Sequence, residues 1–592
     1  MARLTRPLEC QLLRDAPAID AIAADWDRLW RAQPIRHVFQ GHAWHRAILD
    51  AHGAERAPCV VAAYDETGLV GLLPLCVEGG ELRFLGAPYS DYNDLLADPA
   101  RSRDVLRAMV DALDAAGLQR ARLANVRSDA CLRRAANDVD GRVGRRLRWR
   151  FAAACPTTLL EPDAAAAILP ILRKKSLRRQ ENRLLHLGSL AFRHVEDPDE
   201  ARTLLPEFFA QHTARRSMAG EGVLFDRPAP RRFYESLLSR LGLQTIRFGV
   251  LELNRAPVAF HFGFEYDRRF VFYKPAFTVE LWDYSPGDVL LKKLFEYARD
   301  RELVEFDFTR GDEAFKARFA NASRSNYTLH LLPPGAAGAL AALRLRSVES
   351  LHRREAIRAA VERHQARATG LALAVRRHGA IRLGRRAGVA AWRRFVHARE
   401  EVLVFRADRD RTARVPAASL EIRRGRLRDL ARTAPAYPEL FHARRLQLAN
   451  DRLGCGDQLF LALSEGRLLL VAWLGLRREI APAVFGDDPR LPLEREGTVV
   501  YDYWIPAAAS RLHAHPAVLG AIVEASAVPD VWTFCGAKDT RAARAIAAAG
   551  FAESHRMGRI RWLGRTRRTW VETVSGTERS LILSPGTARK LL

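Results

Sequence analysis

The side chains best suited to chemistry lie in residues 303–319, which read L-V-E-F-D-F-T-R-G-D-E-A-F-K-A-R-F. An apolar strand is expected to end there, and acids and bases crowd the turn and first helical residues that follow. Ligand sites gather at the carboxyl ends of strands, and mixed charge there shifts pKa values toward those needed for proton transfer. We therefore take Asp307, Asp312 and Lys316 as candidate catalytic residues. The alternative is that Asp312 and Glu313 cap a short helix while Lys316 is a surface charge.

A second candidate is the start of a helix within W-D-Y-S-P-G-D-V-L-L, residues 282–291. Ser285 suits the N-cap, Pro286 the first helical position, and Gly287 permits close approach of a backbone. A helix N-terminus that follows a strand offers free N–H groups and a positive dipole to a pyrophosphate. Asp288 would compete for the same positive end, and capping alone would also explain these residues, so both interpretations stay open.

Two more segments carry polar side chains in a suggestive order. The run G-A-P-Y-S-D-Y-N-D-L-L, residues 86–96, is predicted to be strand-like, with Asp91, Tyr92 and Asp94 on it. The run K-K-S-L-R-R-Q-E-N-R-L-L-H-L-G, residues 174–188, is predicted to be a basic helix that ends at its glycine. As a bare charge run, the second is typical of a solvated helix face.

The elements that must position these residues follow one pattern three times: a hairpin, a strand, a helix and a further strand. Turn residues split each pair of apolar runs, and a helical pattern follows the third run. The three passes cover residues 58–126, 245–308 and 458–549, the last ending in a helix before Gly550. Hairpin, strand, helix, strand is the core order of the GNAT (acyl-CoA N-acyltransferase) fold. The sequence therefore predicts an α+β protein with repeated GNAT-like folds, in which helices flank mixed sheets.

In combination, these motifs resemble the successive signatures of the CelD/BcsL-like acetyltransferase family, which is related to the FemAB-like group. The resemblance covers roughly residues 35–333, and the G-D-E-x-[YF]-K core at the end of it is the most specific part. Phe315 stands where that family often has tyrosine.

The resemblance implies an N-acyltransferase that uses acetyl-CoA or another acyl-CoA, without a metal, and acts on a sugar or an envelope or exopolysaccharide precursor. The donor thioester would lie between two diverging parallel strands. Asp307 or Asp312 would take the proton of the attacking amine, and the turn at residues 286–287 would hold the phosphates of the donor. The implied site residues are Asp307, Asp312 and Lys316 for catalysis, Asp91, Tyr92, Lys175, Arg178 and Tyr273 for the acceptor, and Ser285, Pro286 and Gly287 for the donor.

Domain boundaries are expected at residues 1–150 and 151–335 for two GNAT-like halves, 336–400 for an arginine-rich helical linker, and 401–592 for a third copy. The third copy is degenerate, because its loop S-R-L-H-A-H-P-A-V-L-G lacks the glycines of a pyrophosphate loop. It is either a structural relic or a GNAT fold with altered donor contacts. His513 and His515 are interpreted as exposed loop histidines.

Charge and composition limit the possible partners and the location of the protein. Lysine and arginine number 94 against 69 acids, for a net charge of +25, and residues 341–400 alone hold 15 arginines and four glutamates. Such a surplus favours an anionic partner. For the linker, the alternatives are a solvated helix, an anionic membrane surface or a nucleic acid. No apolar run is long enough to span a bilayer, and the start does not resemble a signal peptide, so a cytoplasmic location, peripheral to the membrane at most, is expected.

Two other functions stay open from the sequence. One is aminoacyl transfer from charged tRNA to a cell-wall precursor, as the FemAB relation implies, which a net charge of +25 would suit. The other is a scaffold without activity in a polysaccharide-synthesis complex. The seven scattered cysteines, which include no C-x-x-C pair, indicate reduced thiols rather than a zinc site.

Overall fold

The computed structural model describes residues 8–352, 397–408, 420–485, 488–506, 514–562, 565–575 and 578–583. The chain divides into unit 1, Met1–Arg216 with Gly222–Arg358, and unit 2, Ser217–Glu221 with Ala359–Leu592. The boundaries expected at residues 150, 335 and 400 stay predictions. Most of the arginine-rich linker, residues 353–396, lies outside the described residues, and so does His513. No helix in the described ranges is long and apolar enough to cross a membrane.

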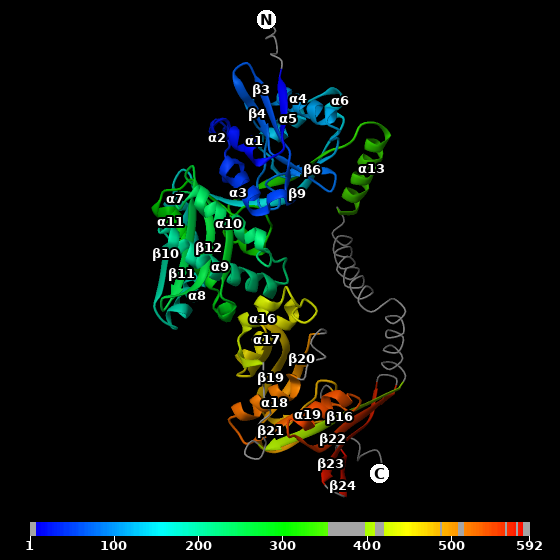
Figure 1. The fold of residues 1–592 in the computed structure, drawn as a ribbon. Helices are drawn as coiled ribbons and strands as arrows, with labels where there is room; N and C mark the ends of the chain where they lie inside the picture. Colours follow the sequence, from blue (N-terminus) through cyan, green and yellow to red (C-terminus); the bar gives the residue numbers. More distant parts are fainter. Residues whose placement is uncertain are drawn as a thin grey trace. The chain divides into compact units, whose positions relative to one another are not determined.

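Unit 1 is built on a large mixed sheet with helices on both faces (Figure 1). Its strands are β2 (Ala57–Pro58), β5 (Leu75–Glu78), β6 (Glu81–Phe84), β8 (Ala121–Arg127), β9 (Leu147–Leu159), β10 (Leu190–His194), β11 (Ile246–Leu253), β12 (Ala256–Tyr266), β13 (Arg269–Phe277), β14 (Glu305–Asp307) and β15 (Ala322–Leu331). Their order is β10-β11-β12-β13-β14-β9-β15-β8-β6-β5-β2. A smaller sheet joins β1 (Glu9–Leu13), β3 (Val60–Asp65), β4 (Gly68–Leu73) and β7 (Leu96–Ala97).

The helices of unit 1 connect and cover these strands. They are α1 (Ala16–Ala21), α2 (Ala23–Arg31), α3 (His42–His52), α4 (Ser102–Ala115), α5 (Cys131–Asp138), α6 (Gly141–Gly144), α7 (Ala164–Leu172), α8 (Lys175–Leu185), α9 (Pro198–Ala219), α10 (Pro228–Leu241), α11 (Pro286–Asp300), α12 (Ala314–Ala317) and α13 (Gly335–His352). Three short 3₁₀ segments join them: η1 (Val38–Gln40), η2 (Gly53–Glu55) and η3 (Val279–Tyr284).

The two halves of unit 1 exchange strands at the centre of the large sheet. β9 follows the elements of the first half in sequence, yet it pairs with β14 of the second half. β15 follows the second half, yet it pairs with β8 of the first half. β9 and β15 also pair with each other, antiparallel. Each half therefore completes the sheet of the other, and residues from both halves can meet at one site.

The alternation of side chains along β12 and β13 divides the core of the second half into two layers. Phe262 and Tyr273 face a cluster with Tyr234 of α10 and Trp44 of α3. Phe272, on the opposite face, packs with apolar side chains of α7, α8 and α11. A third cluster packs α4 and α5 of the first half against β3, β6 and β8.

Unit 2 repeats the topology of the second half around one sheet. Its strands are β16 (His397–Asp408), β17 (Glu421–Gly425), β18 (Gln458–Ser464), β19 (Arg467–Ile480), β20 (Leu491–Trp504), β21 (Asp530–Gly536), β22 (Ala552–Trp562), β23 (Arg565–Ser575) and β24 (Glu578–Leu583), and its helices are α16 (Leu427–Thr433), α17 (Ala443–Gly454), α18 (Ala514–Ala525) and α19 (Thr540–Ala548). The order is β17-β18-β19-β20-β21-β16-β22-β23-β24. β16 lies between β21 and β22 as β9 lies between β14 and β15.

The predicted α+β class, with mixed sheets flanked by helices, is confirmed, but two local predictions are wrong. Residues 86–95 are not a strand: the segment is irregular, and only Leu96–Ala97 forms β7. The reason is that its polar side chains are buried and bond to groups of other elements; both carboxylate oxygens of Asp94, for example, accept N–H bonds from the start of α5. His515 is not in a loop but in α18, with its ring 4.6 Å from that of Tyr503.

Candidate functional site

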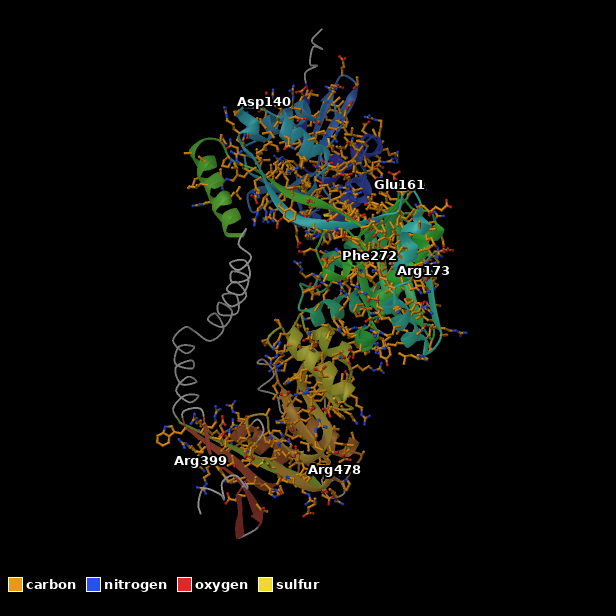
Figure 2. All side chains as sticks on the ribbon, turned by 180° about the vertical axis from the view of Figure 1, so that it is seen from behind. Asp140, Glu161, Arg173, Phe272, Arg399 and Arg478 are labelled. Carbon is orange, nitrogen blue, oxygen red and sulfur yellow. The ribbon has the colours of Figure 1, made fainter. Side chains whose placement is uncertain are left out.

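The candidate site forms where two parallel strands of unit 1 separate. β13 pairs with β14 only from Arg269 to Val271, opposite Glu305–Asp307. β14 then ends, whereas β13 continues to Phe277 and leads through η3 to the start of α11. Phe272, labelled in Figure 2, is the first residue of β13 beyond the pairing. We call this opening, bounded by residues 272–277 and 308–310, the fork.

A β-bulge lies on β13 at the apex of the fork. Lys274 faces Phe262 of β12, but Val271 faces Phe264, so β13 carries one residue more than β12 across this interval. The backbone N–H of Tyr273 donates to Nε2 of the buried His261, at 3.2 Å. Bulges redirect side chains and recur beside active sites. Here Nζ of Lys274 comes to lie 3.8 Å from the centroid of the Tyr273 ring.

Thr309 joins the two arms of the fork. Its hydroxyl donates to the carbonyl oxygen of Phe272 at 3.5 Å, and its N–H donates to Oδ1 of Asp307 at 2.7 Å. Its φ of 58° lies in the left-handed region, which is unfavourable for a β-branched residue. Such strained residues cluster at functional sites, where the surrounding structure holds them in place.

Asp307 is buried at the end of β14 and accepts a hydrogen bond of 2.8 Å from the hydroxyl of Tyr92. Burial, and then the charge of Glu305, raises the pKa of Asp307 to about 6, against the charge of Arg127 and the two hydrogen bonds that Asp307 accepts. Burial also raises the pKa of Tyr92 well above its usual value, so its hydroxyl stays protonated and donates. Near neutral pH, Asp307 is therefore a largely ionised carboxylate that can accept a proton.

A group of charges lies beside this pair. Nε of Arg310, whose side chain is 45% exposed, is 2.9 Å from the buried carboxylate of Asp91. Burial lowers the pKa of Lys274 to about 8; Asp91 opposes this shift, and Arg310 adds to it. The hydroxyl of Tyr273 donates to the carbonyl oxygen of Tyr89 at 2.6 Å. Asp91, Tyr92, Tyr273 and Asp307, all predicted from the sequence, are thus brought together from both halves of unit 1.

Lys316 supports this group from behind. It is buried, and its Nζ donates to the carbonyl oxygen of Arg310 at 2.8 Å and pairs with Glu313 at 2.8 Å. The alternative that Lys316 is a surface charge is wrong, and so is the capping alternative, since Glu313 precedes α12 without a side-chain cap bond. Asp312 is exposed, because the chain turns outward at Gly311, whose φ is 116°.

The start of α11 lies at the far end of β13. Pro286 is the first residue of the helix, as expected. Ser285 is at the N-cap position, but its side chain makes no cap bond, because its backbone is left-handed with φ of 55°. A Cβ on Gly287 would lie 3.2 Å from Cδ1 of Phe277, so glycine allows the helix to approach the strand closely. Asp288 accepts a bond of 2.9 Å from Gln180 of α8.

Lys175 and Arg178 do not join the buried group. Both lie on the exposed face of α8. The same helix passes the start of α11, where its Gln180 contacts Asp288, and Arg318 lies 3.5 Å from the same carboxylate. Arg318 is therefore the cation that these contacts place beside the helix N-terminus, and Lys175 and Arg178 lie exposed on the neighbouring helix.

Two residues of the site were missed by the sequence reasoning. Lys274 stands within R-F-V-F-Y-K-P-A-F, and a cation in the interior of an apolar strand was a signal that could have pointed to it. The role of Thr309 depends on its backbone conformation, for which the sequence carries no signal. In the described part of the chain, no group of three His, Cys, Asp or Glu side chains is placed to hold a metal ion.

In the other two copies, too, the chain makes hydrogen bonds across the place where the corresponding strands separate. β6 and β8 pair at Leu82 and Ala121, and the N–H of Asn93 then donates to the carbonyl oxygen of Asn125 at 2.9 Å, so residues 86–95 line the edge of β8. In unit 2, β20 and β21 pair up to Val500 and Thr533, and the hydroxyl of Tyr503 then bonds to that of Thr533 at 2.6 Å.

The comparison with protein families identifies a known type of domain in unit 1. Residues 172–317 match the model of the acetyltransferase (GNAT) domain, so the chain contains a GNAT acyltransferase domain, and this stretch includes β13, α11, β14 and α12. No curated protein matches the chain.

Solved structures with similar folds over about half of this chain include the following three. FemX is 10% identical and covers 54% of this chain and 97% of its own, with a TM-score of 0.38. L-PGS from Bacillus licheniformis is 14% identical and covers 52% of this chain and 96% of its own, with a TM-score of 0.35. A tandem GNAT protein from the clavulanic acid biosynthesis pathway is 14% identical and covers 56% of this chain and 100% of its own, with a TM-score of 0.34. At these values, no residue role is carried over from them.

Proposed function

We propose that unit 1 is an acyl-CoA-dependent N-acyltransferase, with acetyl as the expected acyl group and a sugar or envelope-polysaccharide precursor as the acceptor. The observation that carries the proposal is the fork, whose long arm leads from the bulge on β13 to the N-terminus of α11. The GNAT match over residues 172–317 supports the class of reaction. Because the matched stretch lies in the second half of unit 1, the proposal puts the donor site there.

In this proposal the donor lies along β13 with its thioester at the fork. Its pyrophosphate meets the N-terminus of α11, where the helix dipole and free N–H groups favour an anion. Gly287 keeps this end close to β13, and Arg318 with the exposed cations Lys175 and Arg178 of α8 adds positive charge.

The acceptor amine then attacks the carbonyl carbon of the thioester. The C–N bond forms, the C–S bond breaks, and CoA leaves as the thiolate. Asp91, Arg310 and Lys274 bind the acceptor at the open side of the cluster, since Arg310 is the exposed member. Asp307 is enclosed behind Tyr92, so the amine proton passes to the hydroxyl of Tyr92 as that hydroxyl passes its own proton to Asp307.

A transfer assay with radiolabelled acetyl-CoA and a panel of amino sugars and nucleotide amino sugars tests the proposal. Removal of a general base lowers rates by about a hundredfold or more, so Asp307→Asn and Tyr92→Phe are each expected to lose transfer to that extent. The matched control is Asp140→Asn, an exposed carboxylate 77% open to solvent, which should keep full activity.

Other outcomes separate the alternatives. Transfer from charged tRNA but not from acetyl-CoA would contradict the proposal in favour of aminoacyl transfer. An intact, folded protein that transfers from neither donor would point to a scaffold. If Tyr92→Phe keeps full activity while Asp307→Asn loses it, the proton relay through Tyr92 would be contradicted. The fork would remain the proposed donor site.

A further inference from the structure

One surface of unit 2 has a strong charge that the proposed function does not use. Residues 554–571 read S-H-R-M-G-R-I-R-W-L-G-R-T-R-R-T-W-V, with six arginines and no acid. They belong to β22 and β23, which pair with each other, and β22 also pairs with the start of β16. Arg399, which marks that end of β16, is labelled in Figure 2.

Cross-strand register determines which of these side chains share a face, because residues directly opposite each other point to the same side. Ile560 of the middle strand lies opposite Arg399 on β16 and Arg568 on β23. Trp562, two residues further and therefore on the same face, lies opposite Arg565. We call the set Arg399, Ile560, Trp562, Arg565 and Arg568 the tryptophan face.

The apolar members of the tryptophan face are open to solvent. Trp562 is 56% exposed, although tryptophan is among the largest apolar side chains, and Ile560 is only partly buried. An exposed apolar strip rimmed by charge marks an interaction site rather than a stable free surface.

Two of the three cationic members, Arg565 and Arg568, make no ion pair in the described part of unit 2, whereas Arg399 pairs with Glu401 at 3.3 Å and lies over the ring of Trp570. Arg565 and Arg568, together with Arg567 beside them, are exposed, and no ion pair to an acid involves any of these three arginines within the described part of unit 2. Other arginines of these strands do have partners: Arg559 pairs with Glu400, and Arg556 with Glu553 at 2.6 Å. The free charge is thus concentrated at the end of the hairpin, around Trp562.

We propose that the tryptophan face docks on the surface of an anionic phospholipid bilayer. Tryptophan is enriched at the interface of bilayers, where its ring sits at the level of the headgroups, and arginines beside it gain from the negative surface potential. A single-stranded nucleic acid would also meet the charge, but successive bases stack on several exposed aromatic rings, and on this face Trp562 is exposed whereas Trp570 is buried and Ile560 is not aromatic. The complementary charge and the apolar centre together favour a lipid surface.

Vesicle flotation with the full chain tests the proposal. The probes are vesicles of phosphatidylcholine alone and vesicles of equal parts phosphatidylcholine and phosphatidylglycerol, each at low and high salt. The full chain is expected to float with the anionic vesicles only, and less at high salt because surface charge is screened. The triple variant Arg565→Gln, Arg567→Gln and Arg568→Gln is expected to bind about a hundredfold more weakly.

A matched control changes the same charge elsewhere in unit 2. Arg424→Gln, Arg541→Gln and Arg544→Gln are also exposed arginines, and this triple variant should bind the anionic vesicles as the wild type does. Lipids brominated along their acyl chains should quench part of the tryptophan fluorescence, and Trp562→Phe should lose that part.

Equal flotation of the wild type and the Arg565 triple variant would overturn the proposal, as would equal losses in both triple variants. Binding of single-stranded RNA that only the Arg565 triple variant loses, without any difference on vesicles, would overturn it in favour of a nucleic acid. Circular dichroism of all variants should match the wild type, since each substituted arginine is exposed.

Discussion

At the scale of single residues, Asp307 is the most informative side chain of the molecule. It is 4% exposed, yet it carries an ionisable group whose charged form is stabilised by the charge of Arg127, the Tyr92 hydroxyl and the Thr309 N–H. Burial of a charge is costly unless it is fully compensated, and the raised pKa of about 6 is the sign of this cost. Such a costly buried charge is typical of a functional position, and proton transfer is a function that requires an ionisable group.

This cost predicts a stability effect that depends on pH. The pKa of Asp307 is about 6 in the fold and near its usual value of about 3.9 in the unfolded chain, so the folded state binds the proton more tightly. The contribution is fully present below about pH 4 and is lost as pH rises through about 6. Asp307→Asn should therefore unfold with a free energy about 1–3 kcal/mol higher than the wild type at pH 8, with little difference at pH 4.

Equilibrium denaturation at both pH values measures this difference. The control is Asp140→Asn, which removes an exposed carboxylate and should show no pH-dependent gain. A wild type that is more stable than Asp307→Asn at pH 8 would show that the buried charge is compensated, and would contradict the cost of burial inferred from the raised pKa.

The sequence could identify Asp307 and Tyr92 as candidates but could not pair them. Both stand in motifs of polar residues after apolar runs, which is a local signal. Their contact joins positions 215 residues apart, and it depends on two halves that complete one sheet. Asp312 shows the converse: it stands in the same motif, but a turn at Gly311 leaves it exposed.

At the scale of elements, the irregular segment at residues 86–95 is held by its polar side chains. Asp94 accepts from the N–H groups of Cys131 and Leu132 at 2.8 and 2.7 Å, so one carboxylate satisfies two donors at the start of α5. Helix N-terminal donors that lose such a partner stay buried without a bond.

Asp94→Ala should therefore lower the free energy of unfolding by about 1–2 kcal/mol, as expected for the loss of an N-terminal cap. Asp94→Asn keeps one acceptor oxygen and should lose less. Denaturant titrations of the three proteins check the order. Equal stability of Asp94→Ala and the wild type would mean that water or another group satisfies these donors.

Most elements could be predicted from the sequence, because hairpins and amphipathic helices carry local periodic signals. The helix start expected at residues 285–287 is the start of α11, Pro286–Asp300, and the strand expected before it within residues 245–308 is β13, Arg269–Phe277. The exchange of β9 and β15 could not be predicted, because pairing partners distant in sequence are chosen by packing rather than by local propensity. For the same reason, the irregular conformation of residues 86–95 could not be predicted. Hydrogen bonds of buried side chains take the place of β-strand pairing in this segment.

At the scale of the whole molecule, three copies of one fold differ in the contacts made where the corresponding strands separate. In the first half of unit 1, Asn93 of residues 86–95 bonds to Asn125 of β8 at this place, and in unit 2 the hydroxyl of Tyr503 bonds to that of Thr533. The second half of unit 1 has a bulge, a strained Thr309 and a glycine at the helix start in this place. The missing glycines of the third copy predict that it is degenerate, whereas the contacts of residues 86–95 with β8 became visible only in the structure.

The most direct test of a donor site at the fork is calorimetric titration of acetyl-CoA into the full chain and into Gly287→Val. A Cβ at Gly287 would already lie 3.2 Å from Phe277, so a valine there should push the start of α11 away from β13. The control is Gly222→Val, where a Cβ would meet nothing within 4 Å. We predict that the wild type and Gly222→Val bind acetyl-CoA alike, and that Gly287→Val binds about tenfold more weakly or not at all. Equal binding by all three proteins, or no binding by the wild type, would contradict the donor site at the fork.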